Sequence, residues 1–324
     1  MAIVLQIRKR VDIINTGVYI FAGFLESGKT TALQGVLTRN ADVINKENKS
    51  VIICTEDGEE EYDSNQLKEI NTSVVMMEDE ESFDLDYLEK IQEEYSPSTV
   101  YIEFNGMWDL KKFIEKPMPE GWIIMNVFTL VDATTFEIYL TNMRQVIMNP
   151  ISVSDVILFN RCTENTKKGE IRRPIKILNP NGQLFFSRMD GSIDDGMEDF
   201  LMPQEDGIVH VDEDIFCSWF VDCIENPDKY YGKRVVFKAM VTSGKGLADN
   251  QFYVGRLAAI CCQADAQFIG FIAEAKEKRP NDKDWIEMEA TVERGQLSQG
   301  KQIILLNANS IKQVDKPEDI YIYA

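Results

Sequence analysis

Histidine is almost absent from this sequence of 324 residues, in which His210 is the only one. A serine-hydrolase triad needs a histidine base beside its nucleophile, and no nucleophile motif accompanies this single imidazole. The cysteines also lack the spacing of a disulfide framework, so we expect all six to be free thiols in a reducing compartment. They are Cys54, Cys162, Cys217, Cys223, Cys261 and Cys262.

Basic residues and long apolar runs are scarce as well. The chain has 34 Lys and Arg against 54 Asp and Glu, a net charge of −20, which argues against a nucleic-acid partner. No apolar stretch approaches the length of a membrane span, and the charges near the N-terminus follow the apolar residues, the reverse of a signal peptide. We therefore expect a cytoplasmic protein without membrane insertion, long enough for two domains. For residues 1–15 we expect either an edge strand or a mobile tail.

Residues 23–31 read GFLESGKTT, a complete G-x-x-x-x-G-K-S/T phosphate-binding loop. A strand-like run precedes it at 17–22, and apolar residues at helical spacing follow it at 31–37. This context gives the motif its meaning, because glycines let backbone N–H groups point at phosphate oxygens and the helix N-terminus adds partial positive charge. We expect Lys29 to reach the terminal phosphates and the Thr30 hydroxyl to bind Mg²⁺. The sequence predicts a nucleoside-triphosphate site.

Further candidates follow two later strand-like runs. The run at 50–54 leads into an acidic segment, 55–63, which is either a solvated loop or a surface for divalent cations. The run at 99–102 ends at Glu103, and Gly106 comes three residues later. A carboxylate at this place holds Mg²⁺ directly or through water, and the glycine N–H senses the γ-phosphate.

Taken together, these segments resemble the CobW-type GTPases, relatives of the HypB and UreG nickel-insertion proteins, over roughly residues 16–190. That family's loop reads like GFLGSGKTT, so Glu26 replaces one glycine, and its switch segment is matched by residues 55–63. Its E-T-T-G, V-D-A and N-P signatures are matched at 103–106, 131–133 and 179–180. The resemblance implies a doubly wound, mostly parallel α/β domain that binds GTP and Mg²⁺.

The resemblance also implies roles for individual residues. The catalytic candidates are Lys29, Glu56 and Glu103, and Thr30 and Glu103 are the candidate Mg²⁺ ligands. The expected nucleotide-binding residues are Gly23, Glu26, Ser27, Gly28, Lys29, Thr30, Thr31, Gly106, Asn160 and Arg161.

Two departures from the family pattern affect what is bound. The guanine-reading N-K-x-D motif is replaced by residues 160–163, Asn-Arg-Cys-Thr, so Thr163 stands where the guanine-binding carboxylate should be. Loss of a charge-assisted hydrogen bond costs about 1.5–3 kcal/mol, which leaves the choice between GTP and ATP open. Arg161 could still stack on the base. The family's Cys-x-Cys-Cys metal site is missing as well, because residues 64–82 contain neither cysteine nor histidine.

The pattern changes near residues 202–207, and we expect domains at 1–203 and 208–324. One helix is predicted at 214–225, and five strands after it predict a small OB-like β-barrel. These strands cover 235–241, 251–260, 267–273, 285–292 and 302–311. The half resembles the soluble C-terminal domain of a bacterial putative permease-subunit family, through motifs at 226–233, 250–256 and 261–266.

Any transition-metal site must use the residues that remain. Cys261 and Cys262 are speculative ligands, since neighbouring side chains on a strand point to opposite faces unless the strand bulges there. Two buried structural cysteines are the alternative, and His210 with Cys217 is a second candidate pair.

The functional prediction is a switch that binds and hydrolyses GTP or ATP with Mg²⁺ and transmits its state to the barrel, coupled to a metal-handling or permease-associated partner. Two alternatives stay open: a nucleotide-gated binding module with little turnover, and a P-loop small-molecule kinase. The sequence lacks the basic lid motif with which such a kinase would stabilise the transferred phosphoryl group.

Overall fold

A computed structural model describes residues 16–39, 48–58, 60, 62–194, 204–260, 263, 266–296 and 302–323. Within these residues the chain forms two compact units. The first contains residues 16–166 and 181–194, and the second contains residues 167–180 and 204–323. No helix in the described ranges is long and apolar enough to cross a membrane.

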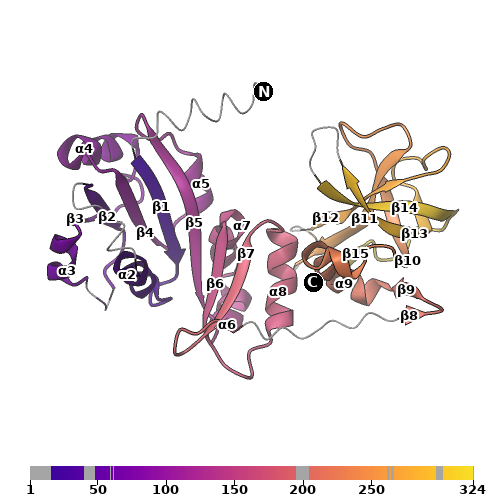
Figure 1. Ribbon diagram of the computed structural model, residues 1–324, viewed down its shortest axis with the longest axis horizontal. Helices are drawn as coiled ribbons and strands as arrows, with labels where there is room; N and C mark the ends of the chain where they lie inside the picture. The colour runs from indigo at the N-terminus through magenta and orange to yellow at the C-terminus, as the bar shows by residue number, and fades with distance from the viewer. Residues whose placement is uncertain are drawn as a thin grey trace. The chain divides into compact units, whose positions relative to one another are not determined.

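The first unit is built on a seven-stranded parallel sheet (Figure 1). In spatial order its strands are β3 (Thr72–Met76), β2 (Ser50–Cys54), β4 (Thr99–Asn105), β1 (Thr16–Gly23), β5 (Trp122–Asp132), β6 (Val156–Cys162) and β7 (Gln183–Arg188). Its helices are α2 (Lys29–Arg39), α3 (Ser64–Glu69), α4 (Leu85–Tyr95), α5 (Leu110–Glu115), α6 (Phe136–Asn142) and α7 (Arg144–Val153).

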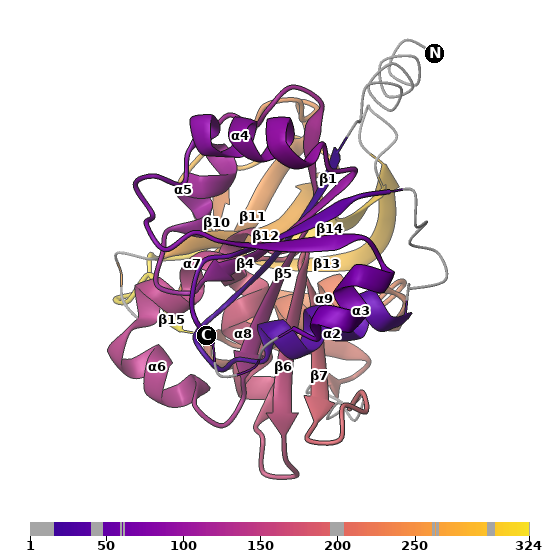
Figure 2. The same ribbon diagram turned by 90° about the vertical axis from the view of Figure 1, so that its left-hand side faces the viewer.

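Helices cover both faces of this sheet (Figure 2). Val18 and Ile20 of β1 pack in one apolar cluster with residues of α4 and α5. Phe21, which points to the opposite face, packs in another cluster with α2 and α3. A strand buried on both sides must be apolar along its length, which explains the continuous runs in the sequence. The predicted doubly wound parallel domain is confirmed.

The sheet order also positions the functional segments. Because all seven strands are parallel, their carboxyl ends lie along one edge, and the segments that follow β1, β2 and β4 meet there. The three strands are direct neighbours in the order β2-β4-β1. The phosphate-binding loop, the acidic segment 55–63 and Glu103 are therefore brought together by topology.

The second unit contains a closed five-stranded barrel, as the sequence predicted. Around the barrel the strands are β10 (Arg234–Thr242), β11 (Gln251–Ala259), β12 (Gln267–Glu274), β14 (Gln302–Gln313) and β13 (Trp285–Gln296). Pairing of β10 with both β13 and β11 closes the ring, and β12 and β14 run parallel. Three short strands flank it: β8 (Gln204–Glu205), β9 (Ile208–Val211) and β15 (Tyr321–Tyr323).

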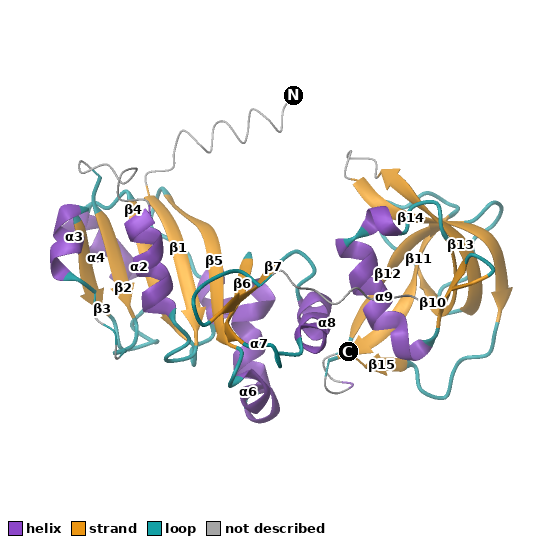
Figure 3. Ribbon diagram, turned by 60° about the horizontal axis from the view of Figure 1, so that its bottom comes forward, coloured by secondary structure: helices purple, strands orange, loops and turns teal. Residues whose placement is uncertain are grey.

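Two helices belong to this unit, α8 (Lys168–Leu178) and α9 (Glu213–Glu225), and a short 3₁₀ turn, η1 (Pro227–Lys229), follows α9. Helix α9 matches the predicted helix and lies beside the barrel (Figure 3). It packs there through Trp219, whose ring contacts Phe237 and Phe271. Glu225 of α9 pairs with two cations of α8, Arg172 and Lys176.

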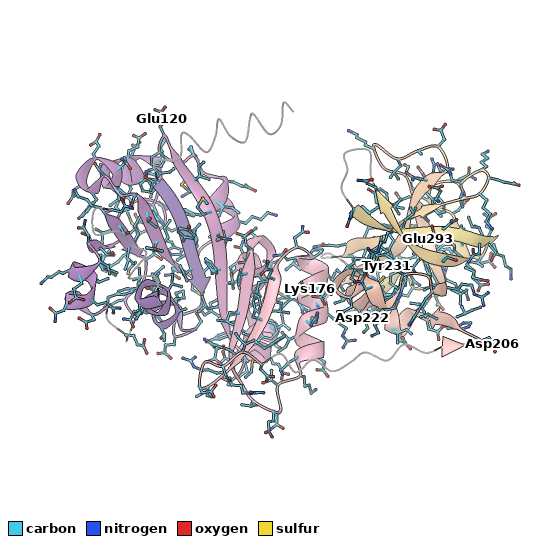
Figure 4. The ribbon with its side chains drawn as sticks, viewed as in Figure 1. Glu120, Lys176, Asp206, Asp222, Tyr231 and Glu293 are labelled. Atoms are coloured by element: carbon cyan, nitrogen blue, oxygen red, sulfur yellow. The ribbon has the colours of Figure 1, made fainter. Side chains whose placement is uncertain are left out.

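Asp222 on α9 explains the motif at 226–233 (Figure 4). Its carboxylate accepts hydrogen bonds from Lys229 Nζ at 2.8 Å, from Asn226 Nδ2 at 2.9 Å and from the Tyr230 hydroxyl. Burial opposes ionisation of this carboxyl, but the three donors outweigh it and hold its pKa below the ordinary value. The motif residues therefore fasten the end of α9 to the turn that enters β10.

Candidate functional site

The phosphate-binding loop joins β1 to α2 in a backbone conformation that needs glycine at two places. Gly23 has φ 143°, and a Cβ there would lie 2.3 Å from the Leu130 carbonyl oxygen. Gly28 has φ 90°, and a Cβ there would lie 2.8 Å from Asn160 Nδ2. Glu26 also has a left-handed backbone, with φ 61°, although it carries a side chain. The residue that departs from the family pattern thus keeps a conformation that favours glycine.

Gly106 contacts this loop directly. A Cβ on Gly106 would lie 2.4 Å from the Gly23 carbonyl oxygen and 2.6 Å from Phe24 N. Only glycine allows so close an approach, so the segment after β4 rests on the backbone of the phosphate-binding loop.

The Lys29 side chain is folded into the loop and is only 3% exposed. Its Nζ donates to the carbonyl oxygens of Gly23, at 2.8 Å, and Phe24, at 2.9 Å. It also forms an ion pair with the carboxylate of Glu56, from the acidic segment. Burial raises the pKa of Glu56, and the attraction of Lys29 offsets this only in part.

Thr30 and Glu103 are hydrogen-bonded to each other. Thr30 Oγ1 donates to Glu103 Oε1 at 2.6 Å, and the Tyr62 hydroxyl donates to the other oxygen, Oε2, also at 2.6 Å. Glu103 is 6% exposed, and its neighbour Cys54 has a pKa raised to about 12, chiefly by burial and then by the Glu103 charge. Sequence reasoning missed Tyr62, although it lies inside the acidic segment that resembles a switch.

Thr31 completes the series, since its Oγ1 donates to Glu60 Oε2 at 2.7 Å. Three consecutive side chains of the loop are thus bonded to three different carboxylates. Together they line one cavity of about 160 Å³. The predicted site residues that line it are Glu26, Gly28, Lys29, Thr30, Thr31, Glu56, Glu103 and Arg161. Gly23, Ser27 and Gly106 line a second cavity, which Glu26 also lines.

Asn160 and Arg161 hold the loop from β6. Asn160 Nδ2 donates to the Ser27 carbonyl oxygen at 2.6 Å. Arg161 Nη1 donates to the Glu26 carbonyl oxygen at 2.9 Å and to Asp132 Oδ2 at 2.5 Å. Sequence reasoning did not assign Asp132 a role. Arg161 is therefore hydrogen-bonded both to the phosphate-binding loop and to a carboxylate on β5.

Thr163 is part of a local turn. Its Oγ1 accepts a hydrogen bond from Asn165 N at 3.3 Å, and its own N–H donates to Thr166 Oγ1 at 2.9 Å. The position that corresponds to the guanine-reading carboxylate is thus occupied by a hydroxyl that accepts from the backbone N–H of Asn165.

The oxygen atoms of Thr30 and Glu103 suit Mg²⁺, a hard cation that prefers hydroxyl and carboxylate ligands. In the part of the chain that the structure describes, no three His, Cys, Asp or Glu side chains are grouped to hold a metal ion. Cys261 and Cys262 lie outside the described residues. Cys217 is buried, and burial raises its pKa to about 11, which disfavours the thiolate form that binds metals.

A family model described as the CobW/HypB/UreG nucleotide-binding domain matches residues 17–185, just over half of the chain. The chain belongs to this family. A second model, the DUF1980 C-terminal domain, matches residues 193–324. A comparison with curated proteins gives no match.

Three solved structures are among those similar to this CobW/HypB/UreG family member. The hydrogenase maturation factor HypB from Archaeoglobus fulgidus is 14% identical, with 57% of this chain and 87% of that chain covered and a TM-score of 0.32. The Zn(II)-bound YjiA GTPase from E. coli is 15% identical, with 83% and 92% covered and a TM-score of 0.41. FlhF complexed with GMPPNP/Mg(2+) is 17% identical, with 57% and 75% covered and a TM-score of 0.32.

Proposed function

We propose that this family member is a cytoplasmic switch that binds and hydrolyses a nucleoside triphosphate with Mg²⁺. The observation that supports this most is the row of Lys29, Thr30 and Thr31 at the start of α2, where each side chain already binds an anionic group. Side chains that hold three carboxylates in one cavity are placed to hold the oxygens of a triphosphate and its cation instead.

Each residue has a role in this proposal. The backbone of the loop and the N-terminus of α2 bind the phosphates, and Lys29 exchanges Glu56 for the terminal phosphate oxygens. Thr30 and Glu103 hold Mg²⁺, which neutralises charge on the phosphates when it is bound. Glu56, released from Lys29, orients the attacking water and accepts its proton, and its raised pKa brings it nearer to the working pH of a base.

The bound nucleotide is GTP or ATP in this proposal, with weak discrimination between them. Thr163 supplies no carboxylate to accept two hydrogen bonds from guanine, and its hydroxyl accepts from Asn165 N. Arg161 is held by Asp132 and by the loop, so its guanidinium plane is fixed beside the nucleotide cavity.

For the second half, we propose an OB-type barrel that receives the nucleotide state and binds a metal-handling or permease-associated protein. The strand order of the barrel supports the OB assignment, and the match of residues 193–324 to the DUF1980 C-terminal domain supports a separate module. We keep 1–203 and 208–324 as the proposed domain bounds. A transition-metal site at Cys261 and Cys262 remains a proposal, to be tested by zinc and nickel titration of the Cys261→Ser/Cys262→Ser variant.

A nucleotide-gated binding module with little turnover is the second candidate. The ion pair between Glu56 and Lys29 favours this candidate. Glu56 is the proposed catalytic base, and while it is bonded to Lys29 it is not available to activate water. Phosphate release with GTP and with ATP, measured with and without Mg²⁺ beside a calorimetric binding titration, separates the two. Binding with turnover supports the switch, binding without turnover supports the module, and no binding refutes both.

A further inference from the structure

The carboxylate of Glu103 is held by one hydroxyl on each oxygen. Thr30, from the phosphate-binding loop, donates to Oε1, and Tyr62, from the acidic segment, donates to Oε2. Both distances are 2.6 Å, in the short range of hydrogen bonds from a hydroxyl to an ionised carboxylate. The only other side chain at Oε2 among the described residues is Cys54, whose Sγ is 3.9 Å away and is a weak donor.

Tyr62 is held by the apolar cluster that it packs against and by the helix that begins after it. Its apolar body packs against the cluster of β1, α2 and α3 residues on one face of the sheet. The next residue, Asp63, is the N-cap of α3, and its carboxylate accepts from Asn65 N at 2.8 Å and from Gln66 N at 3.3 Å. Because its ring is packed, the Tyr62 hydroxyl has a fixed position, and its hydrogen bond fixes the position of Glu103 Oε2.

We propose that Tyr62 is a positioning residue for the metal-binding carboxylate, fixing Oε2 of Glu103 so that Oε1 faces Thr30 and the bound cation. The inference rests on the proposed function, because it takes Thr30 and Glu103 as the Mg²⁺ ligands. Residues that hydrogen-bond to a metal ligand and orient it typically raise metal affinity about ten- to a hundredfold. Since Tyr62 belongs to the segment between β2 and α3, the same hydrogen bond ties the position of that segment to the metal site.

The test is the Mg²⁺ dependence of nucleotide binding in Tyr62→Phe, which keeps the ring and removes the hydroxyl. Binding of a fluorescent GTP analogue is titrated with Mg²⁺ and repeated in excess EDTA. We expect half-maximal binding to need about ten- to a hundredfold more Mg²⁺ than in the wild type, with metal-free binding unchanged. Tyr101→Phe is the matched control: this ring packs in the same cluster, its hydroxyl makes no bond to Glu103, and its titration should follow the wild type.

A double-mutant cycle distinguishes positioning from packing. If Tyr62 acts through Glu103, Tyr62→Phe has no further effect in a Glu103→Ala background, whereas a packing role would persist there. A Tyr62→Phe titration that coincides with the wild type overturns the inference, as does a variant that melts early and loses metal-free binding. If the wild type binds nucleotide but shows no Mg²⁺ dependence, the metal assignment and the inference fail together, and nucleotide binding itself stands. If the wild type binds no nucleotide, the proposed function fails first.

Discussion

Replacing Glu56 by glutamine should tighten nucleotide binding. In the free protein Lys29 Nζ is shared by two carbonyl oxygens and the Glu56 carboxylate, so a phosphate oxygen must displace an internal anion to reach it. Hydrogen bonds that involve a charged group contribute about 1.5–3 kcal/mol, and the bond from the Lys29 ammonium falls from the upper to the lower part of this range when a neutral amide oxygen replaces the carboxylate. The internal competitor is therefore weakened by about 1 kcal/mol, which corresponds to a roughly fivefold lower dissociation constant.

The same substitution should not destabilise the protein at neutral pH. Burial raises the pKa of Glu56 above its ordinary value in spite of Lys29, so its stabilising contribution is present below the unfolded-state pKa and lost as pH rises through the folded-state pKa. A neutral glutamine avoids that loss. We expect the melting temperature of Glu56→Gln relative to the wild type to improve as the pH rises from about 4 to neutrality.

Calorimetric titration with GTP and ATP in the presence of Mg²⁺ measures the affinity, and phosphate release measures turnover. Glu89→Gln, on the exposed face of α4, carries the same charge change and serves as the control. We expect Glu56→Gln to bind more tightly and to turn over more slowly, since it lacks the proposed base. Weaker binding in Glu56→Gln than in the control would refute the reasoning, because Glu56 would then stabilise the complex rather than compete with it.

Three further substitutions test the loop and the choice of base. Lys29→Ala should abolish triphosphate binding in a calorimetric titration while the circular-dichroism spectrum stays unchanged, and an unaltered affinity would remove the loop from the site. Thr163→Asp should raise the preference for GTP over ATP, measured by competition; a wild type that already prefers GTP a hundredfold, about 2.7 kcal/mol, would show that another residue reads guanine. Glu26→Gly should raise the melting temperature slightly, because relief of about 1–2 kcal/mol of left-handed strain exceeds the added chain entropy of about 0.4–1 kcal/mol; a lower melting temperature would contradict the strain at φ 61°.

Local patterns predicted the elements better than their contacts. The phosphate-binding loop could be predicted because its motif depends only on the order of its residues. The barrel strands could be predicted because each is a short apolar run between turns. Tyr62 and Glu103 are 41 residues apart, and Arg161 and Asp132 are 29 apart; these pairs meet only because the sheet order places their segments side by side. Helix α8 was not predicted from the sequence, and neither were the ion pairs of Arg172 and Lys176 with Glu225 of α9.

The carboxylates that bind the loop side chains also affect how the proposed nucleotide cycle ends. Glu56, Glu60 and Glu103 bind Lys29, Thr31 and Thr30 within a single chain, so they stay at high effective concentration whenever phosphate leaves. In the proposed cycle, Glu56 would compete for Lys29 again as soon as the terminal phosphate is released, and would so hasten departure of the diphosphate. A switch of the proposed kind would release its diphosphate without a second protein, and the charge of Lys29 would be balanced by Glu56 before the next nucleotide binds.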